Sequence, residues 1–179
     1  MKRIFVLQLA AFLLATFVVE AQVTLPRTPS PAASVTQTIG ISTVSVNYSR
    51  PKVNGREVWG KLVPYGWNVD PFGLQNSAPW RAGANENTVL TLSHPAKIEG
   101  QLVPAGSYGL FFVINKDNTG EVVLSKEYQA WGSFFYDAKA DQMRAKNQLR
   151  DIPDVESLTY DFSNLSNDGA GLVLNWGKK

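Results

Sequence analysis

The sequence predicts an all-β protein: an antiparallel β-sandwich, jelly-roll-like or barrel-like, with one long irregular loop and at most one or two short helices. First, segments in which apolar and polar residues alternate recur along the 179-residue chain, and this period of two is typical of half-buried strands. Second, Gly, Pro, Asn and Asp separate these segments at the spacing of about 8–12 residues seen in sandwiches and barrels. Third, no long segment has the spacing of an amphipathic helix.

Residues 1–21 predict a secretory signal peptide rather than part of this fold. Lys2 and Arg3 precede an almost wholly apolar stretch, residues 4–19, and the small residue Ala21 follows it. A charged start, an apolar stretch and a small exit residue form the pattern that a signal peptidase reads. The alternative is an uncleaved anchor, although the stretch is shorter than the roughly 20 residues that span a bilayer. We expect cleavage after Ala21, a periplasmic or secreted protein, and no stable membrane span thereafter.

The rest of the chain predicts an extended lead-in over residues 22–33, which hold three prolines, and a single domain over residues 34–179. The absence of cysteine excludes disulfides, thiolate ligands and cysteine nucleophiles. A single histidine, His94, leaves no cluster of imidazole ligands. The formal net charge is only +2, so the sequence predicts no nucleic-acid partner. We also expect no cofactor and no metal; the oligomeric state is left open.

Alternation and turn residues place the strands in order. The predicted strands cover residues 42–48, 88–93, 108–114, 121–125, 158–162 and 172–176, and residues 98–103 reverse direction at Glu99-Gly100-Gln101. Residues 108–114 are apolar on both faces, as in the central strand of a two-layer core. Residues 137–149 predict either a short helix or an edge strand, because their apolar residues are small and irregularly spaced. Asn167-Asp168-Gly169 predicts a hairpin turn.

Residues 49–86 form the predicted long loop, which is aperiodic and rich in Gly and Pro and holds three of the five tryptophans. A connection longer than about 12–15 residues within a domain is usually functional or disordered, and disordered segments lack such aromatic residues. Indole rings offer apolar platforms, and guanidinium groups bind carboxylate or phosphate oxygens. Alternatively, the arginines stack on the tryptophans and pair with carboxylates, which would lock the loop.

A second aromatic cluster, residues 131–137, is predicted to be mostly core, with Trp131 or Tyr136 facing a pocket as the alternative. The candidate ligand-binding residues are therefore Arg50, Arg56, Trp80, Arg81, Asn85, Glu86 and Trp131. They favour a binding module for a polar ligand, either a glycan or a peptide carboxylate. A structural or protein-interaction domain of the cell envelope is the alternative. A hydrolase with Glu86 or Asp137 as its base is a third interpretation, and no catalytic residue is assigned.

The stretch Ser49–Thr88, and above all Trp80-Arg81-Ala82-Gly83-Ala84-Asn85, resembles domain of unknown function 2911 (DUF2911), found in secreted proteins of Bacteroidetes and related bacteria. Residues 103–111, 131–137, 156–162 and 174–176 match the same pattern. The resemblance covers residues 31–176 and implies a single envelope domain, but no activity. Two departures stand out: the chain closes with Gly177-Lys178-Lys179 where members often add a strand, and residues 68–79 lengthen the segment before Trp80.

Overall fold

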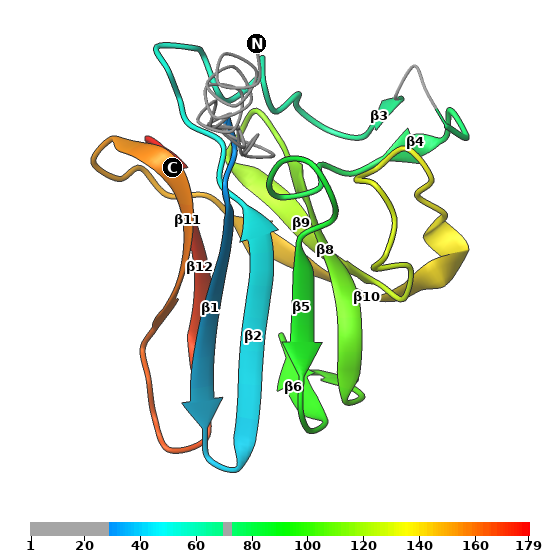
Figure 1. Cartoon of the computed structure of the whole chain (residues 1–179), viewed down its shortest axis with the longest axis vertical. Coiled ribbons are helices and arrows are strands. Elements are labelled where there is room, and N and C mark those ends of the chain that lie inside the picture. The colour runs from blue at the N-terminus through cyan, green and yellow to red at the C-terminus, as the bar shows by residue number, and fades with distance from the viewer. Residues whose placement is uncertain (1–28, 70–72) are drawn as a thin grey trace, which may run out of the picture.

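The computed structural model describes residues 29–69 and 73–179, so the predicted signal peptide lies outside the described residues. Its largest element is a six-stranded antiparallel sheet in the order β1-β2-β5-β8-β9-β10 (Figure 1). These strands are β1 (Ala32–Ile39), β2 (Ser42–Ser49), β5 (Val89–Leu92), β8 (Gly106–Ile114), β9 (Thr119–Ser125) and β10 (Asp141–Gln148).

Three two-stranded antiparallel sheets complete the fold. They pair β3 (Asn68–Val69) with β4 (Ser77–Ala78), β6 (Ala96–Ile98) with β7 (Gln101–Val103), and β11 (Val155–Ser163) with β12 (Gly171–Gly177). Across the described ranges, the helical content is one 3-10 turn, η1 (Ala138–Ala140). In the same ranges, no helix has the length and apolar character needed to cross a membrane. The predicted all-β class is confirmed.

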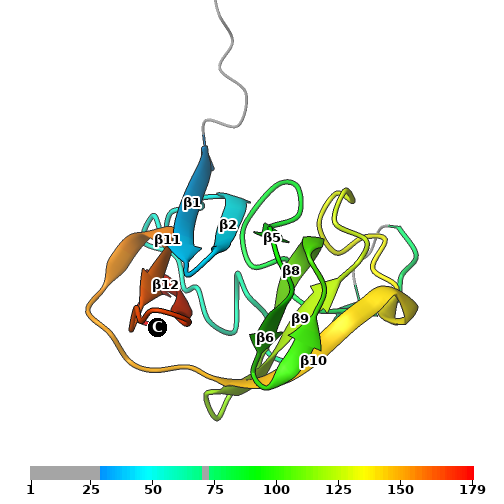
Figure 2. The same ribbon diagram turned by 90° about the horizontal axis from the view of Figure 1, so that it is seen from below.

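The six-stranded sheet curls, and the β11–β12 hairpin lies across the interior from β8, β9 and β10 (Figure 2). The segment that follows β2 joins this hairpin to the rest of the protein. The amide of Val53 donates to the carbonyl of Glu156 over 2.8 Å, and the amide of Leu158 donates to the carbonyl of Pro51 over 2.9 Å. The β11–β12 pair and the large sheet remain separate sheets, so no closed barrel forms.

Most of the strand predictions are confirmed. Three strands were not predicted: β1, and the two-residue strands β3 and β4 within the long loop. The reversal at Glu99-Gly100 is the β6–β7 turn, where these residues have φ angles of 47° and 78°. Residues 137–149 contain both predicted alternatives, η1 followed by the edge strand β10. Strand β1 was missed because two of its four inward positions carry Ala33 and Gln37, which weakens the apolar alternation.

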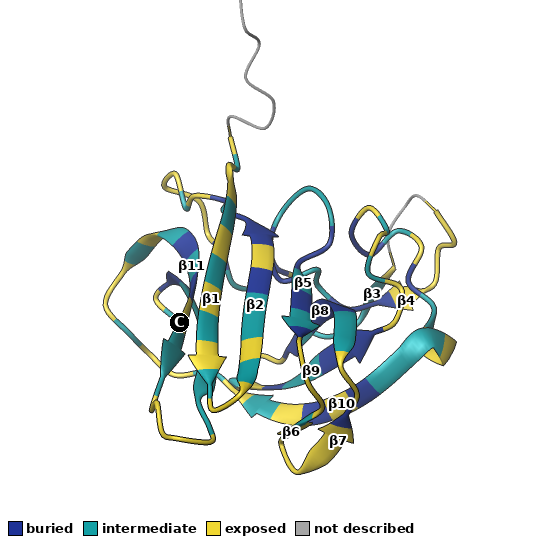
Figure 3. Ribbon diagram, turned by 60° about the horizontal axis from the view of Figure 1, so that its bottom comes forward, coloured by how far each residue is buried: buried dark blue, intermediate teal, exposed yellow. Residues whose placement is uncertain are grey.

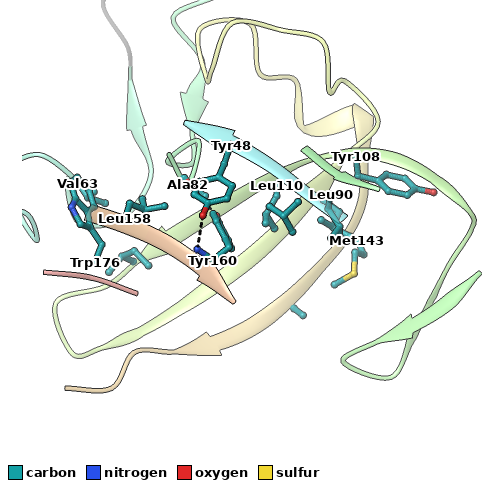
Figure 4. Close-up of a cluster of buried hydrophobic side chains, with 14 of the residues drawn as sticks. Tyr48, Val63, Ala82, Leu90, Tyr108, Leu110, Met143, Leu158, Tyr160 and Trp176 are labelled. Carbon is teal, nitrogen blue, oxygen red and sulfur yellow. Dashed lines mark hydrogen bonds between the residues drawn. The ribbon is translucent and has the colours of Figure 1, made fainter. Parts of the chain in front are cut away.

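The core fills the space between the curled sheet and the hairpin. Tyr48 on β2 and Tyr160 on β11 meet edge to face at 4.8 Å between ring centroids, and the Tyr160 amide donates to the Tyr48 hydroxyl (Figure 4). Strand β8 is buried on both faces, as its sequence predicts (Figure 3): Leu110 belongs to this core, whereas Phe111 packs with Tyr136 in a smaller cluster. Other buried members of the main core are Val46, Leu90, Leu124, Met143, Leu158 and Trp176.

Two leucines of the β11–β12 hairpin offer a matched test of this core. Leu158 is 0% exposed, whereas Leu165 in the turn is 56% exposed. Leu158→Ala should lower the free energy of unfolding by about 2–5 kcal/mol, because it removes a buried side chain and leaves a cavity. Leu165→Ala should change it by no more than about 0.5 kcal/mol. Urea denaturation of both variants measures the difference, and equal losses would contradict the assigned packing.

Candidate functional site

The long loop closes one end of the sandwich with aromatic rings. Trp80 stacks on Trp176 of β12 at 6.0 Å between ring centroids, and Trp59 meets both edge to face at 5.9 and 6.2 Å. We call these three residues the tryptophan cluster. Val58 and Val63 of the same loop are buried within the main core. The loop therefore contributes to the core, and Trp80, a predicted ligand-binding residue, lies among other indoles.

The carbonyl oxygen of Ala82 anchors the second half of this loop. It accepts hydrogen bonds from the Tyr160 hydroxyl over 2.8 Å and from the Thr88 hydroxyl over 3.1 Å. Ala82 has a φ of 53°, a left-handed conformation that costs a non-glycine residue about 1–2 kcal/mol. At the next position only glycine fits, because a Cβ on Gly83 would lie 2.7 Å from the Thr88 hydroxyl oxygen. The Arg-Ala-Gly-Ala-Asn stretch thus forms a tight buried turn.

Two of the predicted arginines hold the chain through backbone carbonyls. Arg50 donates from Nε to the carbonyl of Leu158 over 3.0 Å and from Nη2 to the Thr159 hydroxyl over 2.9 Å. Arg56 donates to the carbonyls of Val53 and Lys52 over 3.0 and 2.6 Å. Arg50 therefore fastens the loop to β11, and Arg56 braces its own turn. That either also binds a ligand stays a prediction.

The structure brings together another subset of the predicted residues around Gly132. Arg81 donates to the carbonyl of Asn85 over 2.7 Å, and its guanidinium lies 5.0 Å from the centre of the Phe134 ring. Gly132 has a φ of 63°, and a Cβ there would overlap this guanidinium. The next residue back along the chain, Trp131, is 48% exposed.

Two further candidates lie on the neighbouring stretch of the loop. Asn85 donates from Nδ2 to the carbonyl of Ser30 over 3.2 Å. Glu86 borders a shallow surface groove beside Tyr48 and Asn87. Arg81, Asn85 and Trp131 are therefore gathered in one region, whereas Arg50, Arg56 and Trp80 contact other parts of the protein.

A cavity of about 580 Å³, which the sequence analysis missed, lies toward the other end of the sandwich. Most of the residues that line it are apolar, whereas polar groups supply almost half of its exposed surface. The lining comes from the large sheet, the β6–β7 hairpin and the β11–β12 hairpin. The larger apolar side chains around it are Ile39, Val44, Leu90, Leu92, Ile98, Leu110, Phe112, Val122, Leu124, Phe162 and Leu172. They lie on eight different strands, so no local pattern in the sequence marks the cavity.

The cavity leaves apolar side chains incompletely covered. Val44, Phe112, Val122 and Leu172 pack against the core but are only half-buried. Four charged residues also border the cavity, and all four are exposed: Lys97, Glu99, Lys146 and Asp168. The arrangement combines an apolar interior with charged groups in contact with solvent. Pockets that bind small molecules usually have about this volume and a mainly apolar lining.

A polar network on the outer face of the sheet also escaped prediction. The Tyr136 hydroxyl lies 2.8 Å from each carboxylate oxygen of Asp141, to which Arg144 donates from Nε over 2.6 Å. Arg144 also lies over the Trp67 ring at 4.7 Å and so links β10 to the long loop. Burial and the bond to Asp141 raise the pKa of Tyr136 well above its usual value. Within the part of the chain that the structure describes, no group of three His, Cys, Asp or Glu could hold a metal ion.

These features define a class: an antiparallel β-sandwich that an aromatic loop seals at one end and that holds an apolar cavity toward the other. A family model described as "Protein of unknown function (DUF2911)" matches residues 30–179, and the chain belongs to this family. The family resemblance drawn from the sequence is thereby confirmed. No curated protein and no solved structure matches the chain.

The raised pKa of Tyr136 predicts a loss of stability in alkali. A phenol in the unfolded chain ionises near pH 10, whereas folded Tyr136 keeps its proton to higher pH. The contribution of Tyr136 to the free energy of unfolding is therefore complete below about pH 10. Above that pH the contribution falls by up to about 1.4 kcal/mol per pH unit. Urea denaturation from pH 9 to about 11 should show a shallower decline for Tyr136→Phe than for the native protein. Equal slopes would contradict the assigned environment.

Proposed function

We propose that the protein is an exported binding domain whose cavity holds an amphiphile with a long apolar chain, such as a fatty acid. The observation that carries the proposal is the cavity of about 580 Å³, most of whose lining residues are apolar. The interiors of proteins are close-packed and hold few voids larger than a water molecule. A concavity of this size, open to solvent, has room for an occupant, and an acyl chain would cover the half-buried side chains of Val44, Phe112 and Val122.

The charged residues around the cavity support an amphiphile over a wholly apolar ligand. Lys97, Glu99, Lys146 and Asp168 are all exposed, so they can interact with a polar head group in water. A head group drawn into the apolar interior would lose its hydration without gaining partners, at a cost of several kcal/mol. The chain of the ligand thus lies inside and its head remains at the solvent. Export is supported by the signal-peptide pattern of residues 1–21.

A polar ligand at the long loop is the second candidate, favoured by the 48% exposure of Trp131 beside Arg81. An exposed indole face suits stacking against a sugar ring, since it is apolar with a polar edge. A peptide carboxylate would instead use the guanidinium. This candidate ranks second because Arg81 and Asn85 already donate to backbone carbonyls.

Binding of a dansyl-labelled fatty acid, followed by fluorescence, tests the cavity. Ser42 lines the cavity, whereas its neighbour Thr43 on the same strand is exposed on the opposite face. Ser42→Trp should weaken binding at least about tenfold by filling part of the cavity, and Thr43→Trp should leave it unchanged. Organic extraction and mass spectrometry of the protein purified from its host should also recover an acyl lipid. Absence of probe binding, or equal effects of the two variants, would overturn the proposal.

A pair of alanine variants tests the second candidate. Arg81→Ala removes a charged hydrogen bond to the Asn85 carbonyl and should lower the free energy of unfolding by about 1.5–3 kcal/mol. Trp131→Ala should change stability by at most about 0.5 kcal/mol, because the ring is half exposed. If the loop binds a glycan, Trp131→Ala should abolish binding to a glycan array while the fold persists. Unchanged glycan binding in this variant would remove Trp131 from the site.

A further inference from the structure

Two strand-to-strand turns and one short hairpin strand carry large aliphatic side chains in water. Ile41 in the β1–β2 turn is 84% exposed, Leu102 in the β6–β7 hairpin is 68% exposed, and Leu165 in the β11–β12 turn is 56% exposed. We call these residues the aliphatic tips. Single exposed leucines are common on protein surfaces. What sets the three aliphatic tips apart is their shared location, not the exposure of any one of them.

The aliphatic tips surround the cavity rather than lying at random. Ile39 and Ser42 on either side of Ile41, Lys97 opposite Leu102 in the hairpin, and residues 168–170 near Leu165 all line the cavity. The β1–β2 and β11–β12 turns also lie against each other, because a Cβ on Gly40 would be 3.2 Å from the carbonyl oxygen of Asn167. In Figure 1 these turns and the β6–β7 hairpin lie at the lower end of the molecule.

From this placement, we propose that the cavity end docks on the surface of a lipid bilayer, with Ile41, Leu102 and Leu165 inserted among the lipids. Ligand would then pass between membrane and cavity without crossing water; this exchange rests on the proposed function, whereas docking rests on the aliphatic tips. A bilayer suits this end better than a charged partner does, because Lys97 and Lys146 are balanced by Glu99 and Asp168. Binding should thus come from apolar insertion and depend little on anionic lipid or on salt.

Flotation with phosphatidylcholine vesicles, with and without phosphatidylglycerol, tests the docking. The native protein should float equally well with both vesicle types. Burial of one large aliphatic side chain corresponds to about a tenfold change in affinity. Ile41→Ser combined with Leu165→Ser should therefore lower vesicle affinity about a hundredfold. Both residues are exposed, so binding of the dansyl-labelled fatty acid in solution should persist in this double variant.

Leu74→Ser combined with Phe135→Ser is the matched control, since these residues are also exposed but belong to neither the cavity nor the aliphatic tips. Loss of flotation in this control, or in neither double variant, would overturn the docking. The docking would also be overturned if the native protein did not float and ran as a dimer on gel filtration, while the Ile41/Leu165 variant ran as a monomer. This end would then be an interface between copies of the chain. Flotation without binding of the fatty-acid probe would support docking and overturn the cavity function instead.

Discussion

The whole fold depends on two hydrogen bonds to the carbonyl oxygen of Ala82, which hold the large sheet, the β11–β12 hairpin and the long loop together. Tyr160 brings β11 to this oxygen, and Thr88 brings the segment just before β5. Since the Tyr160 amide also binds the Tyr48 hydroxyl, β2 joins the same arrangement. The large sheet, the hairpin and the long loop thus meet at one buried point, and the two bonds offset the unfavourable left-handed backbone of Ala82.

Closure at this point explains why the interior is filled at one end and hollow toward the other. The tryptophan cluster and the buried valines of the loop supply the apolar volume beside Tyr48 and Tyr160. The connections at the other end hold their large aliphatic side chains, Ile41 and Leu165, in solvent rather than within this space. An unfilled apolar cavity weakens a fold, because its lining lacks contacts on one side. Occupation by a ligand would restore those contacts.

The fold was predictable from sequence wherever the signal was local. Alternation at Val44, Val46 and Tyr48 marks β2, and Glu99-Gly100 marks a turn that needs positive φ. Strand β1 escaped because Gln37 occupies an inward position. The cavity escaped for a different reason: its lining comes from residues far apart in the chain, and a void is a property of how side chains pack rather than of any segment.

The arginine and tryptophan content of the loop has a structural cause that a sequence alone does not separate from ligand binding. An irregular segment pairs few of its carbonyls within a sheet, and buried carbonyls need donors. Arg56 and Arg81 each donate to a carbonyl of the loop itself, and Arg50 donates to the carbonyl of Leu158 on β11. A guanidinium offers several donors on one planar group and can brace two points of the chain at once. Arginine density therefore follows the irregularity of the backbone here, and this is why the proposed function is placed at the unfilled cavity and not at the arginines.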